Sequence, residues 1–325
     1  MEKEATGGKG RAAAVPGIVF FGTPDFAVPS LRKLLDSGVA VRLVISQPDR
    51  PSGRGRKVHE SPVKKLAIDA GIPLYQPEHL NEGEVFEKIG TSGAECAIVV
   101  AFGQILPMSL LDIFPLGTLN VHGSLLPKFR GAAPIQRAIM AGENVTGVAI
   151  MLLDAGMDTG PVLSQKELIL GPMDTFGMIY GRLAEEGAEL LLDTFSDWTA
   201  GRLTARAQDD ALASYAPPIK REELRINWKS PANNIINNIR AFDPAPGAWF
   251  VLGGKRVKCF GASSFSWNAA CVAGEVAGVA DCGLIVTGGC GRSVCIGELQ
   301  IEGQRRMRAS DFTRGRPIRR GIILE

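Results

Sequence analysis

The spacing of apolar residues predicts alternating strands and helices in the first half of the chain. Short apolar runs typical of buried strands occupy 18–21, 39–46, 96–102 and 118–121. Helical spacing of apolar residues lies between the first two runs, at 25–37, and recurs over a longer stretch at 173–201. Strands separated by helices indicate an α/β fold with a Rossmann-like, doubly wound parallel sheet.

The second half of the chain follows a different pattern. Ile235, Ile236 and Ile239 predict one helix over 231–242. Short apolar segments broken by glycine come next, at 249–252, 256–260, 274–279, 283–286 and 293–299. This density of short strands is typical of a small OB-like β-barrel.

These patterns predict the domain organisation. A loose polar tail covers 1–16, where no apolar core of a secretory signal is present. We expect an α/β domain at 17–205, a linker at 206–225 that its tandem prolines keep extended, and an OB-like domain at 226–325. No apolar run approaches the ~20 residues of a membrane helix, so we expect no membrane partner.

Three polar side chains stand where predicted strands end. Asn120 and His122 alternate with Val121 and therefore share one face of their strand. Asp158 lies in a glycine-punctuated turn after the apolar run at 148–153. An amide, an imidazole and a carboxylate together can move one proton and stabilise one oxyanion. An isolated Asn-x-His is more often a strand end with one hydrogen-bonded histidine, so the carboxylate is what favours chemistry.

Metal and dinucleotide chemistry are disfavoured. The three histidines, His59, His79 and His122, are far apart, and no Cys-x-x-Cys pair occurs. The first predicted turn, at 21–27, lacks the Gly-x-Gly-x-x-Gly spacing of a dinucleotide site. Six cysteines at irregular spacing indicate buried thiols in a reducing compartment, hence the cytoplasm, although a redox or zinc role stays open.

A net charge of +2 conceals a division along the chain. Residues 216–325 carry 16 Lys and Arg against 9 Asp and Glu, whereas the preceding part carries 20 against 25. The basic second half indicates a polyanionic partner, with a solvated basic face as the alternative. A second basic stretch, at 47–57, is so rich in proline and glycine that we predict a flexible loop without regular structure, which folds on a partner.

Several motifs in this order resemble a known family. Asn120-Val-His122, Ser124-Leu-Leu-Pro127 and Asp158-Thr-Gly-Pro161 resemble the core of the folate-dependent formyltransferases. Phe21-Gly-Thr-Pro-Asp-Phe26 and Arg130-Gly-Ala-Ala-Pro-Ile-Gln136 resemble, within that family, the enzymes that act on methionyl-tRNA. The likeness runs from about residue 18 to the C-terminus.

The resemblance implies transfer of the formyl group of 10-formyltetrahydrofolate, a co-substrate, to the α-amino group of initiator methionyl-tRNA. It implies that Asn120, His122 and Asp158 are catalytic. It also implies a folate pocket formed by Gly103, Gln104, Ile105, Leu106, Ser124, Leu125, Leu126 and Pro127. The tRNA-binding loop that it implies contains Arg54, Arg56 and Lys57. Two alternatives stay open: a formyltransferase or formylfolate hydrolase with a small-molecule substrate, and a non-catalytic RNA-binding protein on the same scaffold.

Overall fold

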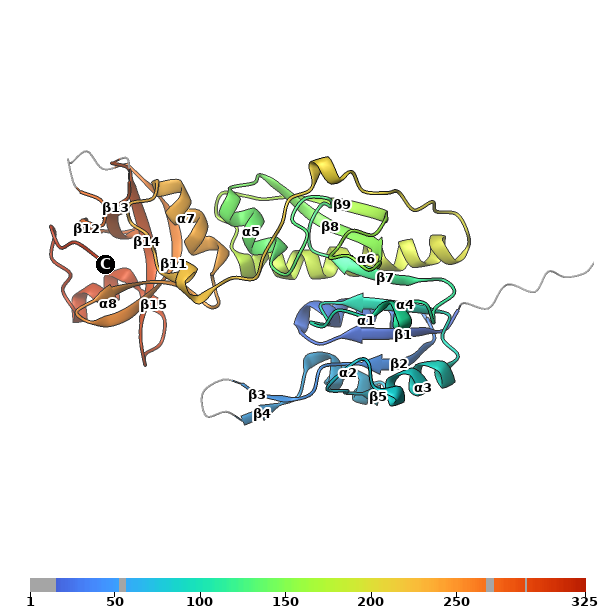
Figure 1. Ribbon diagram of the computed structural model, residues 1–325. Coiled ribbons are helices and arrows are strands. Elements are labelled where there is room, and N and C mark those ends of the chain that lie inside the picture. The colour runs from blue at the N-terminus through green and yellow to red at the C-terminus, as the bar shows by residue number, and fades with distance from the viewer. Residues whose placement is uncertain (1–15, 53–56, 267–271, 290) are drawn as a thin grey trace, which may run out of the picture. The chain divides into compact units, whose positions relative to one another are not determined.

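The structure is a computed structural model that describes residues 16–52, 57–266, 272–289 and 291–325 (Figure 1). It divides into two compact units. One contains Met1–Leu119 and Phe195–Thr204, and the other contains Asn120–Thr194 and Ala205–Glu325. The domain boundaries expected at 16, 205 and 225 stay predictions.

The first unit is built on parallel strands. β1 (Ile18–Gly22) pairs with β2 (Val41–Ile45) and with β6 (Cys96–Val100), and β5 (Leu74–Tyr75) pairs with β2. β1 and β6 are buried at every position, as strands covered on both faces must be. The helical segments of this unit are η1 (Asp25–Ala27), α1 (Val28–Asp36), α2 (Pro62–Asp69), α3 (Gly83–Ser92) and α4 (Met108–Leu111).

The strand order of the main sheet is β5-β2-β1-β6-β7-β8-β9, with β7 (Thr118–His122), β8 (Val145–Leu152) and β9 (Val162–Ile169) completing it. The predicted α/β fold with a doubly wound sheet is confirmed, with one difference: β9 pairs antiparallel with β8. The chain between them, at 153–161, closes a hairpin and is too short for the crossover that parallel pairing requires.

The long helix predicted near the middle of the chain is α6 (Phe176–Thr199). A Cβ added at Gly187 of this helix would lie 3.0 Å from Val121 and 3.2 Å from Val148. The helix therefore covers the face of β7 and β8 that carries these valines. Asn120 and His122 alternate with Val121 and lie on the other face.

The C-terminal part is an antiparallel sheet consistent with the predicted small barrel. Its strand order is β10-β11-β14-β13-β12, and β15 pairs with β14. Three helical elements of the second unit precede this part in sequence: α5 (Pro134–Ala141), η2 (Asp210–Leu212) and η3 (Arg221–Leu224). The C-terminal part itself consists of α7 (Ala232–Ala241), β10 (Ala248–Leu252), β11 (Lys255–Phe265), β12 (Val276–Ala280), β13 (Gly283–Thr287), β14 (Ser293–Ile301), β15 (Met307–Arg308) and α8 (Ala309–Gly315). The short elements β15 and α8 were not predicted.

The basic stretch at 47–57 was predicted without regular structure, and this was wrong at its flanks. β3 (Arg50–Ser52) and β4 (Lys57–His59) form a two-stranded antiparallel ladder. Pro51 is tolerated because a two-stranded ladder leaves one side of each strand unpaired, where no N–H is needed. Among the described helices, none has the length and apolar composition that crossing a bilayer requires.

Candidate active site

The end of β7 presents two buried polar side chains on one face. Asn120 is 9% exposed and His122 is 6% exposed, in a strand that is buried at all five of its positions. Within the described residues, the Asn120 side-chain amide has no hydrogen-bond partner. A buried amide without a partner is available to donate to a ligand.

Both ring nitrogens of His122 have neighbours. Nε2 lies 3.0 Å from the carbonyl oxygen of Phe129, and Nδ1 lies 3.6 Å from Oδ2 of Asp158. A carbonyl oxygen can only accept, so Nε2 carries a hydrogen. A lone pair on Nδ1 would then face a carboxylate and be repelled, whereas a second hydrogen would be attracted. The Asp158 carboxylate is therefore the group that a hydrogen on Nδ1 would face.

Asp158 is held in a backbone conformation that side chains other than glycine rarely adopt. Its φ is 55°, and its Oδ2 accepts a hydrogen bond of 2.8 Å from the N–H of Gly131. Of the described non-glycine residues, only Ala101, Phe129 and Asp158 have positive φ. Each lies at or beside a predicted site segment in the sequence, which agrees with the clustering of strained backbone at functional sites.

Gly131 is required where it stands. Its φ is 120°, and an added Cβ would lie only 2.8 Å from the carbonyl oxygen of Ala216. Only glycine brings the backbone this close, and that approach aims the N–H at Asp158.

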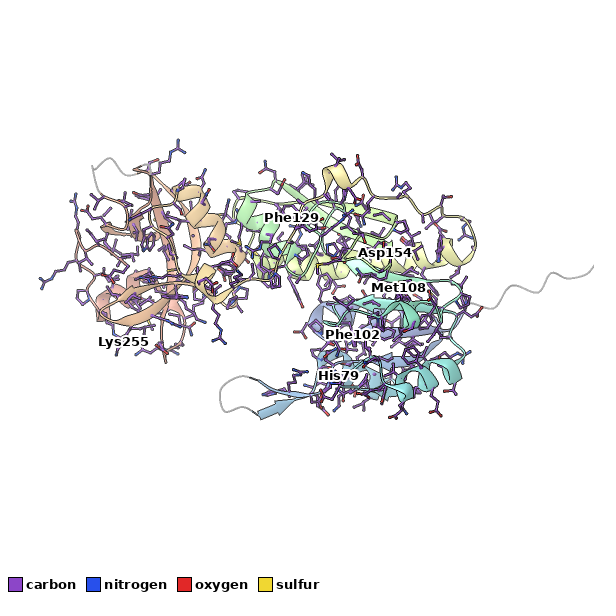
Figure 2. All side chains as sticks on the ribbon, in the orientation of Figure 1. His79, Phe102, Met108, Phe129, Asp154 and Lys255 are labelled. Carbon is purple, nitrogen blue, oxygen red and sulfur yellow. The ribbon has the colours of Figure 1, made fainter. Side chains whose placement is uncertain are left out.

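The other carboxylate of this loop, Asp154, stabilises the loop itself, because it accepts hydrogen bonds from Gly156 N–H at 3.0 Å and Thr159 Oγ1 at 2.7 Å. Figure 2 marks Asp154 and Phe129.

The predicted folate segment at 124–127 follows β7 directly. Ser124 is fully buried and donates to the Lys128 carbonyl at 2.6 Å, and Leu126 packs into a core cluster with Ala149, Met151 and Val162. These two side chains are occupied by the fold. Leu125 and Pro127 are half-buried, so their side chains are the members of this segment that remain open to a ligand.

The other predicted folate segment, at 103–106, lies in the first unit after β6. Leu106 is buried, whereas Ile105 is 80% exposed. Gln104 donates to Gln47 Oε1 at 3.1 Å and to the Glu78 carbonyl at 3.3 Å. The segment therefore combines a tethered amide with an exposed apolar side chain, which suits contact with an apolar ligand surface.

Most of the predicted tRNA-binding residues lie outside the ranges that the structure describes. Arg54 and Arg56 lie outside the described residues, and Lys57 begins β4 with a side chain that is likewise outside them. Across the described ranges, no group of three or more His, Cys, Asp or Glu side chains is arranged to hold a metal ion.

Two family matches divide the chain in sequence. Residues 17–195 match the formyl transferase family, and residues 218–317 match the formyl transferase C-terminal domain. The chain belongs to the formyl transferase family. The resemblance drawn from the motifs around Asn120 and Asp158 is therefore confirmed.

Relatives in this family extend over nearly the whole chain. The methionyl-tRNA formyltransferase of Syntrophus aciditrophicus is 42% identical over 94% of this chain and 98% of its own length. That of Moorella thermoacetica is 44% identical over the same shares. Among solved structures, the sugar 3N-formyl transferase WlaRD covers 90% of this chain and 99% of its own, with a TM-score of 0.63 and 20% identity. At that identity the structural likeness shows the formyltransferase fold alone.

Sequence reasoning missed two residues that contact the loops around Asp158. Arg130 was quoted only as part of a motif, yet its side chain is 2% exposed, an unusual location for a guanidinium. Gln208 falls in the predicted linker and reaches the Asp158 loop, donating to the carbonyl of Asp158 at 2.8 Å. The arginine inside the mostly apolar motif 130–136 was a usable signal, whereas nothing in the local pattern marked Gln208.

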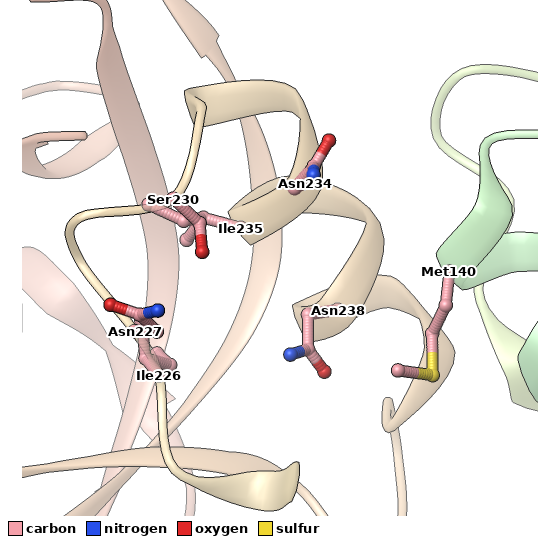
Figure 3. A pocket seen from close by; sticks show the side chains of 7 residues that line it. All are labelled: Met140, Ile226, Asn227, Ser230, Asn234, Ile235 and Asn238. Atoms are coloured by element: carbon pink, nitrogen blue, oxygen red, sulfur yellow. The ribbon is translucent and has the colours of Figure 1, made fainter. Parts of the chain in front are cut away.

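The second unit also contains a cavity of about 220 Å³ where α5 meets α7 (Figure 3). It is lined by Met140, Ile226, Asn227, Ser230, Asn234, Ile235 and Asn238. None of these is a predicted site residue, and none is titratable near neutral pH. The cavity is therefore no candidate for acid–base chemistry.

The basic C-terminal half carries less free charge than its composition suggests. Arg240 is 9% exposed and donates to the carbonyls of Asp174 and Gly171, and burial lowers its pKa. Arg306 pairs with Asp243 and Glu298. These arginines stabilise the fold, so contact with a polyanion falls to the remaining surface cations.

Proposed function

We propose that the chain transfers the formyl group of 10-formyltetrahydrofolate to the α-amino group of initiator methionyl-tRNA, producing formylmethionyl-tRNA for translation initiation. The observation that carries this proposal is the likeness to methionyl-tRNA formyltransferases at 42% and 44% identity over 94% of the chain. It covers both the α/β part and the C-terminal part. A small-molecule formyltransferase would have no need for the basic loop at 47–57.

The reaction joins an amine to a formyl carbon. The α-amino group titrates near ~8, so a useful fraction is neutral at pH 7 without a strong base. Its nitrogen attacks the formyl carbon, a carbon–nitrogen bond forms, and the formyl oxygen becomes an oxyanion. Collapse of this intermediate breaks the bond to the folate nitrogen, which leaves with a proton that the attacking nitrogen gives up.

We assign the Asn120 amide to the oxyanion, because it is buried, unpartnered within the described residues and placed at a strand end. His122 contributes positive charge near the same position. Because Nε2 already donates to Phe129 and Nδ1 faces Asp158, its main contribution is electrostatic. Asp158 orients the imidazole or a water that carries the proton between the two nitrogens.

The binding residues follow from the same proposal. Segments 103–106 and 124–127 bind folate, with Ile105, Leu125 and Pro127 as apolar side-chain contacts and backbone groups as the polar ones. Arg54, Arg56 and Lys57 bind the tRNA, and the C-terminal sheet adds phosphate contacts. The free thiols of Cys96 and Cys259, both buried, support a reducing compartment, and we place the enzyme in the cytoplasm.

One assay tests the proposal against its alternatives. Purified protein is incubated with 10-formyltetrahydrofolate and charged initiator tRNA, with uncharged tRNA and water as control acceptors. We expect formyl transfer to the charged tRNA alone. Release of formate without an RNA requirement would identify a hydrolase, and tRNA binding without turnover would identify a non-catalytic RNA-binding protein.

A further inference from the structure

A closed ring of hydrogen bonds connects Asp158 to a buried arginine. Gln208 Nε2 donates to the carbonyls of Asp158 and Gly160, at 2.8 and 2.7 Å. Gln208 Oε1 accepts from Arg130 Nε at 3.0 Å. The next residue after Arg130, Gly131, donates its N–H to the Asp158 carboxylate at 2.8 Å. The ring therefore holds Asp158 by its backbone and by its side chain together.

The segment that contains Gln208 is fixed against both loops. Arg206 exchanges two backbone hydrogen bonds with Val162, at 2.8 and 2.9 Å. Further on, Ser214 accepts from the Arg130 N–H at 2.8 Å and from the Phe129 N–H, through its hydroxyl, at 2.9 Å. Gln208 therefore reaches the Asp158 loop from a segment that is anchored on both sides of it.

The orientation of the Gln208 amide is determined by its partners. Arg130 Nε can only donate, so the oxygen of the amide must face it and the nitrogen must face the two carbonyls. A glutamate at this position would keep the bond to Arg130 but would place an oxygen against two carbonyl oxygens. Gln208→Glu thus removes the hydrogen bonds to the Asp158 loop while leaving the size of the side chain nearly unchanged.

Stability alone does not account for the buried arginine. Its charge is paired with Asp210, at 2.8 Å, but that carboxylate is 85% exposed while Arg130 is 2% exposed. Burying a charge is costly, and apolar replacements of buried ion pairs are often neutral or stabilising. What Arg130 does achieve is to fix Gln208, and through it the positive φ of Asp158.

We propose that Arg130 and Gln208 are positioning residues that hold the Asp158 carboxylate opposite Nδ1 of His122. Neither has to touch substrate. Without Gln208, the Asp158 loop loses the contacts to the carbonyls of Asp158 and Gly160 that oppose relaxation of the left-handed backbone at Asp158, and the carboxylate moves away from the imidazole. The catalytic consequence of this inference rests on the proposed function, whereas the structural consequence does not.

The first measurement needs no activity. In Gln208→Glu, amide hydrogen exchange of Gly131, followed by NMR, should accelerate at least about tenfold, because its N–H loses the Asp158 carboxylate. The control is Gln300→Glu, since Gln300 also donates from its side chain to a backbone carbonyl, that of Gln304 at 2.8 Å. Unchanged exchange at Gly131, or equal acceleration in the control, overturns the proposal.

The second measurement separates positioning from folding. Gln208→Glu should lower kcat on the order of 10- to 100-fold, as displacement of a catalytic group by about 1 Å does, with KM for folate and for tRNA unchanged. Arg130→Lys should lower kcat by a smaller factor, because lysine keeps the positive charge but lacks the several N–H donors of the planar guanidinium. In single turnovers with Asp158→Asn as background, Gln208→Glu should have no further effect. If Gln208→Glu lowers the rate as much in the Asp158→Asn background as in the wild type, or if it raises KM and leaves kcat normal, the proposal is overturned. A wild-type protein without transfer activity would contradict only the proposed function.

Discussion

Two regions of the second unit handle polar groups in opposite ways. Around Asp158, polar side chains are buried or half-buried and bonded to backbone groups, as His122 is to Phe129 and Gln208 is to Gly160. In the C-terminal sheet, cations lie at the surface on aromatic rings, as Arg256 does over Trp249 with 4.5 Å to the ring centroid. The first region depends on one arrangement of a few groups, whereas the second distributes its charge over many.

The difference predicts how each region responds to substitution. A group aimed at a developing charge in a buried site has no replacement, so its loss is large and appears in turnover. A surface cation facing a polyanion is one of many, so its loss is small and appears in affinity and salt dependence. The predictions below test whether this separation holds.

The largest effect is expected for Asn120→Ala. Removing the proposed oxyanion donor should lower kcat about 100- to 1000-fold, equivalent to ~3–4 kcal/mol, with little change in tRNA affinity. Steady-state formylation and a tRNA-binding titration measure the two quantities. The control is Asn234→Ala, which removes an exposed amide from α7 and should leave both unchanged. Equal losses in binding and turnover would contradict the assignment of Asn120 to the oxyanion.

A smaller effect is expected for Arg54→Ala, in the basic stretch between β3 and β4. We expect kcat/KM for charged tRNA to fall on the order of tenfold, because one charge-assisted contact is lost, while formyl transfer to a small amine or to water survives. Arg202→Ala is the control, since Arg202 pairs with Asp197 at the surface of the first unit. Loss of the small-amine reaction in Arg54→Ala would place this loop in the chemistry instead.

The elements were predictable where local pattern decides them. Apolar runs identified β1, β6 and the C-terminal strands, because a strand that is buried on one face or on both must carry apolar residues at the buried positions. Strand alternation predicted that Asn120 and His122 share one face, and the structure makes Thr118–His122 a strand. The motif at 158–161 indicated the turn but not the positive φ of Asp158, which is set by hydrogen bonds from elsewhere.

The rest depended on contacts distant in the sequence. Gln208 lies far along the chain from Asp158, and no periodicity connects an extended polar segment to a loop it bonds. The antiparallel pairing of β9 depends on which strand it finds as a neighbour, which an apolar run does not specify. The β3–β4 ladder forms in spite of Pro51, because backbone pairing overrode local propensity.

A contact between α5 and η3 should respond to pH. Arg137 of α5 holds Glu223, before α7, through hydrogen bonds of 2.5 and 3.0 Å, and this guanidinium lowers the pKa of Glu223. A carboxyl with a depressed folded-state pKa stabilises the fold above its unfolded pKa, and that stability disappears as pH falls through the folded value. Both side chains are partly exposed, so we expect about 1 kcal/mol.

Glu223→Gln should therefore lower Tm at pH 7, and the difference from wild type should shrink as the pH falls below about 4. Thermal unfolding followed at several pH values measures it. Glu222→Gln is the matched control, since Glu222 is the adjacent, exposed carboxyl in η3. A Tm difference that stays constant across this pH range would show that Glu223 acts by packing and not by charge.

The smallest effect is expected for Lys255→Ala, at the exposed start of β11 (Figure 2). Loss of one phosphate contact should weaken tRNA binding only a few-fold and reduce the slope of log affinity against log salt by about 1, with kcat unchanged. Lys88→Ala is the control, because Lys88 lies in the first unit beside Glu84 and over Tyr75. If Lys255→Ala lowered kcat as Asn120→Ala does, charge in the C-terminal sheet would act on the reacting groups, and the two regions would not divide chemistry from affinity.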